Sequence, residues 1–224
     1  MVDNRTVYDR TATTFASHID RLINTGRYRR GNLFLYSALT SVSPNGNILD
    51  YGCGPGRISL LLARRGFRVR GIDPSPEMIA VAKQQFLDGL QVEFQCRPTI
   101  ADQPTGFFDA ITCSSVIEYV PDPEHLLREC LRVLRYNGVL IISFANRCSV
   151  SRALFQHRNL HLPDQKHLWD AHEFHQLLIG SGFRPMGKPR YFESLCDRLA
   201  PLTYVSRLQF VGTLGLFVAV NASY

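Results

Sequence analysis

The middle of the chain is built from short hydrophobic runs that alternate with turns and with amphipathic stretches. Between most of these runs, hydrophobic residues recur at intervals of three and four, which predicts helices. The last run is hydrophobic throughout, as is typical of a strand buried on both faces of a sheet. We predict strands at residues 47–50, 67–73, 91–96, 108–114 and 139–144. Their alternation with helices predicts an α/β fold, a doubly wound and mostly parallel sheet with helices on both faces.

Capping signals set the predicted helix boundaries. Ser75-Pro76-Glu77 is typical of a helix start, because it supplies a capping hydroxyl, a proline at the first position and an acid near the positive helix end. Asp122-Pro123-Glu124 repeats the pattern. We expect the first of these helices to end at Gly89. We expect the second to end at Asn137-Gly138, with Leu134 on its inward face.

The two ends of the chain follow other patterns. We interpret the 224 residues as one domain with an N-terminal helical lid (1–46), a core (47–145), a covering segment (146–182) and C-terminal strands (183–224). Strands expected at 184–192 and 214–221 bring the sheet to seven strands. Open α/β sheets bind ligands at the carboxyl ends of their strands, so both outer segments are expected to cover that edge.

Composition and charge narrow the class of protein. With 45% hydrophobic and 20% charged residues, the chain is typical of globular proteins. We expect no signal peptide, because the first residues are polar, and no membrane span, because the hydrophobic stretch at 210–220 is far shorter than the ~20 residues required. Six dispersed cysteines without a C-x-x-C motif indicate reduced thiols in a cytoplasmic protein and no zinc site. The net charge of +6 favours anionic partners, but the arginines are spread over several elements.

A glycine-rich turn, ILDYGCGPGRIS, follows the first predicted strand at Ile48–Ser59. A strand, a tight glycine turn and a helix start together let backbone N–H groups approach a ligand without interference from Cβ atoms. Asp73 ends the second strand 73 − 56 = 17 residues after the last glycine, where a carboxylate can accept both hydroxyls of a ribose. The sequence therefore predicts a ligand that contains a nucleoside.

Other ligands that glycine-rich turns bind do not fit this sequence. A fingerprint for NAD or FAD needs its third glycine at position 57, where the chain has Arg57. No Gly-Lys-Ser/Thr follows, which excludes a phosphate loop. The turn could also be only a tight turn, Asp73 only a helix-capping acid before Pro74, and Met78 only a core residue.

Four motifs resemble those of class I S-adenosylmethionine-dependent methyltransferases, in the order of that family and over about residues 47–145. They are DYGCGPG (50–56), GIDPSPEM (71–78), FFDAI (107–111) and LRVLRYNGVL (131–140). The resemblance implies a Rossmann-like methyltransferase fold and S-adenosylmethionine as cofactor. The small-molecule type, similar to quinone-ring O-methyltransferases, is the expected subclass.

The resemblance also implies roles for individual residues. Asp50 would orient the glycine turn or bind the methionine ammonium through water, while Asp73 would hold the ribose hydroxyls. Pro74 and Met78 would line the adenine, Ser114, Ser115 and Val116 would lie under the sulfonium, Tyr8 would belong to the lid, and Arg29 or Arg30 would pair with the methionine carboxylate. The predicted cofactor-binding residues are Tyr8, Arg30, Asp50, Gly52, Cys53, Gly54, Gly56, Asp73, Pro74, Met78, Pro98, Ser114 and Ser115.

The third strand departs from the family pattern. Many relatives place an aspartate after it to bind the adenine amino group, and this chain has Cys96-Arg97-Pro98-Thr99 there. Backbone groups, or Asp102, would have to read the adenine instead.

Transfer to an oxygen requires that a proton be removed, and histidine is suited to this task. Five of the seven histidines follow the core: His157, His161, His167, His172 and His175. We predict His167 as the catalytic base and Tyr119 as a second catalytic candidate, with Glu118 as a further pocket residue. A surface position in a polar segment is the simpler interpretation of each histidine, and no carboxylate pattern accompanies them to predict a metal site.

The predicted function is methyl transfer to a small molecule, at an oxygen of a phenol, hydroxyl or carboxylate group, with an acceptor that is anionic or aromatic. An RNA-modifying methyltransferase is the first alternative. It is disfavoured because Ser114-Ser115-Val116-Ile117 stands where an Asn/Asp-Pro-Pro-aromatic tetrad would be expected, so we expect no nucleic-acid partner. A non-catalytic protein that binds S-adenosylmethionine is the second alternative.

Overall fold

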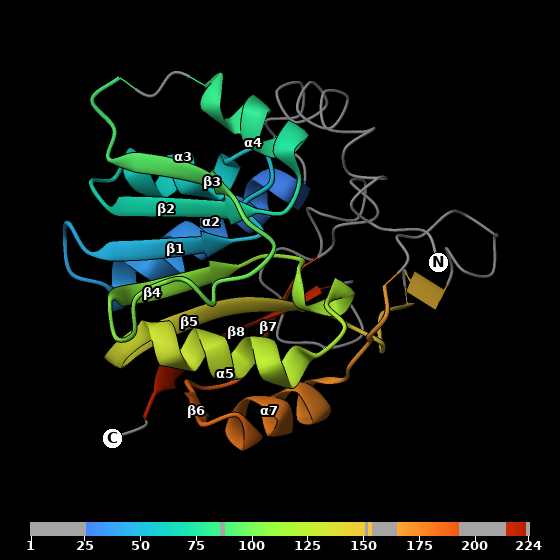
Figure 1. Ribbon diagram of the computed structural model, residues 1–224. Coiled ribbons are helices and arrows are strands. Elements are labelled where there is room, and N and C mark those ends of the chain that lie inside the picture. Colours follow the sequence, from blue (N-terminus) through green and yellow to red (C-terminus); the bar gives the residue numbers. More distant parts are fainter. Residues whose placement is uncertain (1–25, 86–87, 151, 154–164, 193–213, 223–224) are drawn as a thin grey trace.

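A twisted eight-stranded sheet forms the centre of the molecule, with helices on both of its faces (Figure 1). This computed structural model describes residues 26–85, 88–150, 152–153, 165–192 and 214–222. The strand order is β3-β2-β1-β4-β5-β8-β6, and β7 also pairs with β8. The strands are β1 (Asn47–Tyr51), β2 (Arg68–Asp73), β3 (Val92–Cys96), β4 (Phe108–Cys113), β5 (Leu134–Ala145), β6 (Phe183–Pro185), β7 (Arg190–Phe192) and β8 (Leu214–Asn221).

The first five strands are parallel, as the sequence predicted. Residue Asp50 of β1 lies opposite Gly71 of β2 and Thr112 of β4, so the carboxyl ends of the central strands meet at one edge. Strand β8 runs antiparallel to β5 and carries β6 and β7 along its other side. The single strand expected at 184–192 is in fact two strands, β6 and β7, because the chain leaves the sheet between them at Gly187 (φ +78°). The sheet therefore has one strand more than predicted.

Helices cover the two faces because alternate strand residues point to opposite sides. Ile48 and Ile141 belong to the core that α2 and α3 cover, whereas Leu49 and Leu140 belong to the core that α5 and α7 cover. The helices are α2 (Gly26–Ser41), α3 (Arg57–Ala63), α4 (Pro76–Lys83), α5 (Pro123–Val133), α7 (Ala171–Gly180) and the short 3-10 helix η1 (Ile117–Tyr119).

The N-terminal segment was expected to cover the carboxyl edge of the sheet. Its described part, α2, instead packs on a face, because Leu33, Phe34 and Ala38 join the hydrophobic core there. Residues 1–25 of the predicted lid, including Tyr8, lie outside the described residues.

Capping was predicted correctly at the helix starts. The side chain of Ser75 accepts the backbone N–H of Met78, and Asp122 accepts that of His125. The predicted ends were wrong. Helix α4 stops at Lys83 rather than Gly89, and its end tightens there: the N–H groups of Gln84 and Gln85 donate to the carbonyls of Val81 and Ala82, three residues earlier, at 3.2 and 3.3 Å.

The boundary between α5 and β5 also differs from the prediction. The helix ends at Val133, and β5 begins at Leu134 rather than after Asn137-Gly138. Asn221 of β8 explains this junction, because its side-chain amide donates to the carbonyls of Leu131, Leu134 and Arg135 at 3.1–3.2 Å. These contacts hold the helix end against the sheet.

The described residues bear on two expectations from composition, reduced cysteines and the lack of a membrane-spanning helix. Five cysteines lie within them, and all five are free thiols. No helix in this part of the chain combines the length and the hydrophobicity needed to cross a bilayer.

Candidate functional site

The glycine turn leaves the carboxyl end of β1 and is fastened to β2. The N–H groups of Gly52 and Cys53 both donate to the carbonyl of Ile72, at 2.8 and 3.0 Å. Next in the chain, the N–H of Gly54 donates to Oδ2 of Asp73 at 2.8 Å. The turn is therefore held by the strand that ends beside it.

The three glycines have different tasks. All three have positive φ angles, between +52° and +80°, which favour glycine. A Cβ atom at Gly52 would overlap the side chain of Val116, and one at Gly56 would lie 2.6 Å from the ring of Phe94. A Cβ at Gly54 would meet no described atom within 4 Å. Packing thus requires two of the glycines, and Gly54 is the one beside which no described residue lies.

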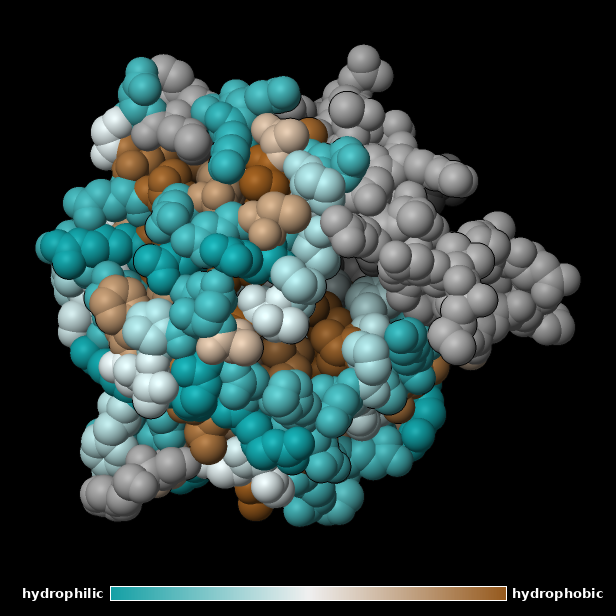
Figure 2. All heavy atoms as spheres, in the orientation of Figure 1, coloured by the Kyte–Doolittle hydropathy of each residue, from teal (hydrophilic) through white to brown (hydrophobic). Residues whose placement is uncertain are grey.

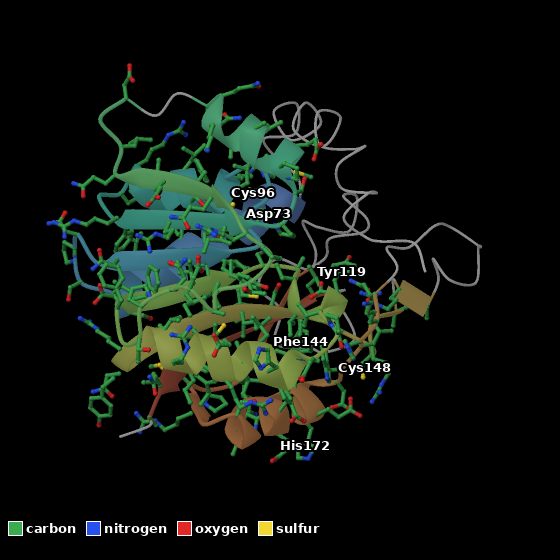
Figure 3. The ribbon with its side chains drawn as sticks, in the orientation of Figure 1. Asp73, Cys96, Tyr119, Phe144, Cys148 and His172 are labelled. Carbon is green, nitrogen blue, oxygen red and sulfur yellow. The ribbon has the colours of Figure 1, made fainter. Side chains whose placement is uncertain are left out.

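Asp73 connects the glycine turn to the start of α4. Its side chain is 9% exposed; Oδ2 accepts the N–H of Gly54, and Oδ1 accepts the N–H of Ser75 at 2.9 Å. Ser75 itself caps α4, so Asp73 is more than the capping acid of the simpler interpretation. Figure 3 shows Asp73 at the carboxyl edge, close to Cys96 at the end of β3.

Asp50 lies deeper, with 1% of its surface exposed. Its two oxygens accept the hydroxyl groups of Ser59 in α3 and Thr112 in β4, at 2.6 and 2.8 Å. Burial raises the pKa of this carboxyl from 3.8 to about 6, although both hydrogen bonds lower it. These contacts support the first of the two predicted roles, which is to orient the glycine turn and the helix that follows it.

The residues predicted to line the adenine differ in exposure. Pro74 and Pro98 are exposed near the ends of β2 and β3, where Cys96 donates its thiol to the carbonyl of Pro74. Met78 is only 2% exposed and is a core residue, as its simpler interpretation held. Asp102, the proposed substitute for the missing aspartate, pairs with Arg97 at 3.5 Å.

The turn after β4 lies between the glycine turn and β5. Ser115 adopts a left-handed backbone conformation (φ +55°), and its N–H donates to the buried hydroxyl of Ser143 at 2.8 Å. The hydroxyl oxygen of Ser114 is buried and has no hydrogen-bond partner among the described residues. Strained residues and unpartnered hydroxyls concentrate at functional sites. Ser143 was not predicted, although a serine inside an otherwise hydrophobic strand is a signal that could have indicated it.

His167 contacts the turn that follows β4. Its Nε2 lies 3.1 Å from the carbonyl oxygen of Val120, and its backbone N–H donates to the carbonyl of Glu118. Because a carbonyl can only accept, Nε2 carries the hydrogen and the lone pair of the neutral ring is on Nδ1. The ring stacks on Trp169 with centroids 5.4 Å apart.

Tyr119, the second catalytic candidate, is half-buried in η1, and Figure 3 shows it at the edge of the sheet where β4 ends. In Figure 2, most of the visible face is hydrophilic; hydrophobic atoms show in several places, among them the upper left and the centre, beside the carboxyl ends of β4 and β5.

The other candidates lie elsewhere. His172 is exposed on α7, far from Asp73 in Figure 3, and His175 lies beside the ring of Phe217. The side chain of Arg30 and the residues His157 and His161 lie outside the described part. A cavity of about 430 Å³ between α2, Arg65 and Arg190 is lined by none of the predicted site residues.

A buried polar cluster lies beside His167, and only Glu118 among its members was predicted as a pocket residue. Glu118 is fully buried, and Arg152 is 4% exposed. Gln165 contacts both of them. Arg152 and Gln165 belong to no motif, so nothing in the sequence marked them.

Residues 23–186 match the family described as a methyltransferase domain, which is more than half of the chain. The chain belongs to this family. The predicted family is thereby confirmed, and S-adenosylmethionine is the cofactor that goes with it.

Curated relatives match about half of the chain. The ubiquinone biosynthesis O-methyltransferase of Xanthomonas oryzae pv. oryzae (strain PXO99A) is 40% identical over 110 residues, which are 48% of this chain and 46% of that protein. The chain thus spans about half the length of the curated relatives it matches.

Solved structures confirm the Rossmann-like methyltransferase fold. One is the complex between the Haloferax volcanii Trm112 methyltransferase activator and a methyltransferase, with a TM-score of 0.73, 20% identity and 98% of both chains covered. Another is magnesium protoporphyrin IX methyltransferase from Synechocystis PCC 6803 with bound SAH, with a TM-score of 0.72, 18% identity and coverage of 98% of this chain and 100% of that one.

Proposed function

We propose that the protein transfers a methyl group from S-adenosylmethionine to an oxygen atom of a small, aromatic or anionic acceptor in the cytoplasm. The observation that carries the cofactor site is the hydrogen bond between Gly54 N–H and Asp73, with no atom of the described residues within 4 Å of a Cβ placed on Gly54. It presents a bare backbone and a fixed carboxylate together at the carboxyl edge, where open α/β sheets bind nucleosides.

The residues present fit this cofactor. Asp73 would hold the ribose hydroxyls, and the backbone around Gly54 would lie along the methionine end. The buried hydroxyl of Ser114 would face the bound group from the turn after β4. When bound, S-adenosylmethionine supplies a methyl group already activated by its sulfonium, so the protein mainly has to position the acceptor and exclude water.

His167 would accept the proton of a phenol or hydroxyl acceptor. The Nε2–H bond to Val120 fixes the ring and leaves Nδ1 to act as the base. Trp169 behind the ring, and Tyr119 in η1, provide flat surfaces suited to an aromatic acceptor. The Xanthomonas relative supports an oxygen acceptor, since that protein is an O-methyltransferase.

Calorimetric titration of S-adenosylhomocysteine tests the cofactor site. We expect the wild-type protein to bind it, Asp73→Ala to lose this binding, and the exposed control Asp88→Ala to retain it. NADH should not bind to any of the three. Binding of NADH instead, or no binding to the folded wild-type protein, would overturn the proposal.

Methyl transfer itself is tested with labelled S-adenosylmethionine and three sets of acceptors: catechols and phenols, aromatic carboxylates, and tRNA. Labelling in either small-molecule set supports the proposal. Labelling of tRNA alone would show that the protein modifies RNA, and cofactor binding without labelling of any set would favour the non-catalytic alternative.

A further inference from the structure

Three polar side chains form a continuous hydrogen-bonded row beside His167, on the side of the site where the acceptor is proposed to bind. Nη1 of Arg152 donates to Oε1 of Gln165 at 2.6 Å, and Nε2 of Gln165 donates to Oε1 of Glu118 at 3.4 Å. The two ends of this row, Arg152 and Glu118, are a cation and an acid that are both buried. Gln165 suits its place between them, because its amide accepts on one side and donates on the other.

The same region is tied together by backbone hydrogen bonds. The carbonyl of Glu118 accepts the N–H groups of Lys166 and His167 at 2.9 and 3.2 Å, so the residues after Gln165 lie directly on η1. Trp169 donates its N–H to Ala145 at the end of β5. Residues 165–169 are thus held between the ends of two neighbouring strands.

Arg152 connects this row of side chains to the end of β5. It follows β5, and its Nε donates to the carbonyl of Asn146 at 3.2 Å, immediately beyond the strand. A buried charge that loses a partner costs more than the hydrogen bond contributed, because the group cannot return to water. The position of Gln165 is therefore set by what it does for Arg152 and Glu118 together.

We propose that Gln165 is a positioning residue for the acceptor side. By bridging Arg152 and Glu118, it holds His167 and Trp169 against η1, so that Nε2 of His167 stays on the carbonyl of Val120 and Nδ1 keeps its direction. This inference rests on the proposed role of His167 in methyl transfer.

The polarity of the bridge gives a sharp test. Gln165→Glu retains an acceptor for Arg152 but places a second carboxylate against that of Glu118, so the two repel each other. Glu118→Gln retains an acceptor for the amide of Gln165. The double variant Glu118→Gln/Gln165→Glu restores a donor opposite an acceptor at both contacts. The matched control is Gln176→Glu, on the exposed side of α7.

Trp169 provides a readout that does not require an acceptor, because it is the single tryptophan of the chain and stacks on His167. We expect Gln165→Glu to shift its emission maximum to longer wavelength as the stacked pair loosens. The emission of Glu118→Gln, the double variant and Gln176→Glu should stay close to that of the wild type. Affinity for S-adenosylhomocysteine should remain within about twofold in all of them, because the glycine turn is untouched.

In the labelling assay, kcat should fall about 10- to 100-fold in Gln165→Glu with little change in KM for the cofactor, and the double variant should recover most of this loss. If Gln165→Glu does not fold, its thermal unfolding shows it. The test then compares the tryptophan emission and kcat of the double variant with those of Glu118→Gln. A double variant as impaired in emission as Gln165→Glu, or wild-type emission and kcat in Gln165→Glu, would overturn the inference. Normal cofactor binding with no methyl transfer by the wild type would overturn the proposed function instead. The emission results would still test whether Gln165 holds His167 and Trp169 in place.

Discussion

The backbone N–H of Gly54 donates to Oδ2 of Asp73, 19 residues further along the chain, at 2.8 Å. This bond joins the end of β1 to the end of β2 at the point where the two strands meet the open edge. It orients the carboxylate before any ligand is present, since the second oxygen is held by the N–H of Ser75. Preorganisation of this kind lowers the entropy lost when a ligand binds.

The first prediction separates Gly54, beside which no described residue lies, from a glycine that packs. Gly54→Ala should destabilise the protein by about 1–2 kcal/mol, the cost of a left-handed backbone for alanine, and should weaken binding of S-adenosylhomocysteine more than it lowers stability. Gly56→Ala adds a collision with Phe94 to the same strain, so we expect a loss of about 2–4 kcal/mol. Denaturant unfolding and calorimetric titration measure the two effects. Equal losses of stability in both variants would contradict this division of tasks.

The second prediction concerns pH and Asp50. Its pKa is about 6 in the folded protein and 3.8 in the reference state, so the folded protein binds more protons between these values. The contribution of this group to stability is therefore fully present below about pH 4 and is lost as the pH rises through 6, by on the order of 3 kcal/mol. Asp50→Asn cannot ionise and lacks this loss.

Comparing the wild type with Asp50→Asn cancels the titration of all other groups. We expect the free energy of unfolding of the wild type to decline relative to that of Asp50→Asn between pH 4.5 and pH 7.5, as measured by denaturant titration at each pH. A difference that stays constant over this range would show that Asp50 titrates normally in the folded protein.

Much of the parallel core could be predicted from local sequence. The strand at 47–50 and the start of α4 at Pro76 were placed to within one residue. The buried pair Ile48-Leu49 stands directly before the glycine turn, and a Ser-Pro-Glu start satisfies the helix end by itself. The junction between α5 and β5 could not be predicted in this way. Asn221, which fixes it, lies 86–90 residues from the carbonyls it binds.

The third prediction tests that junction. Asn221→Ala leaves three carbonyls without this donor and should destabilise the protein by about 1–3 kcal/mol. Asn221→Asp should be more destabilising, because it places a carboxylate against the same oxygens. Thermal and denaturant unfolding of both variants measure this order, and a stable Asn221→Asp would show that the amide is not what holds the end of α5.

The candidate site was predictable where it depends on motifs and not where it depends on packing. The glycine turn and Asp73 lie in motifs with fixed spacing, so their proximity could be expected. The different tasks of Gly54 and Gly56 could not, because they depend on where the ring of Phe94 lies. Gln165 looks like any polar residue in a polar segment until the fold places it between two buried groups.

The last prediction concerns His167 as the base. In His167→Gln, the side-chain amide can still donate to the carbonyl of Val120, but nothing remains to accept a proton. We expect kcat to fall about 10²- to 10⁴-fold, the usual contribution of general base catalysis, while the affinity for S-adenosylhomocysteine and the unfolding midpoint stay close to those of the wild type. His172→Gln, an exposed change on α7, is the matched control and should leave kcat unchanged. A kcat for His167→Gln within about twofold of the wild type would exclude His167 as the base and leave Tyr119 as the remaining predicted candidate.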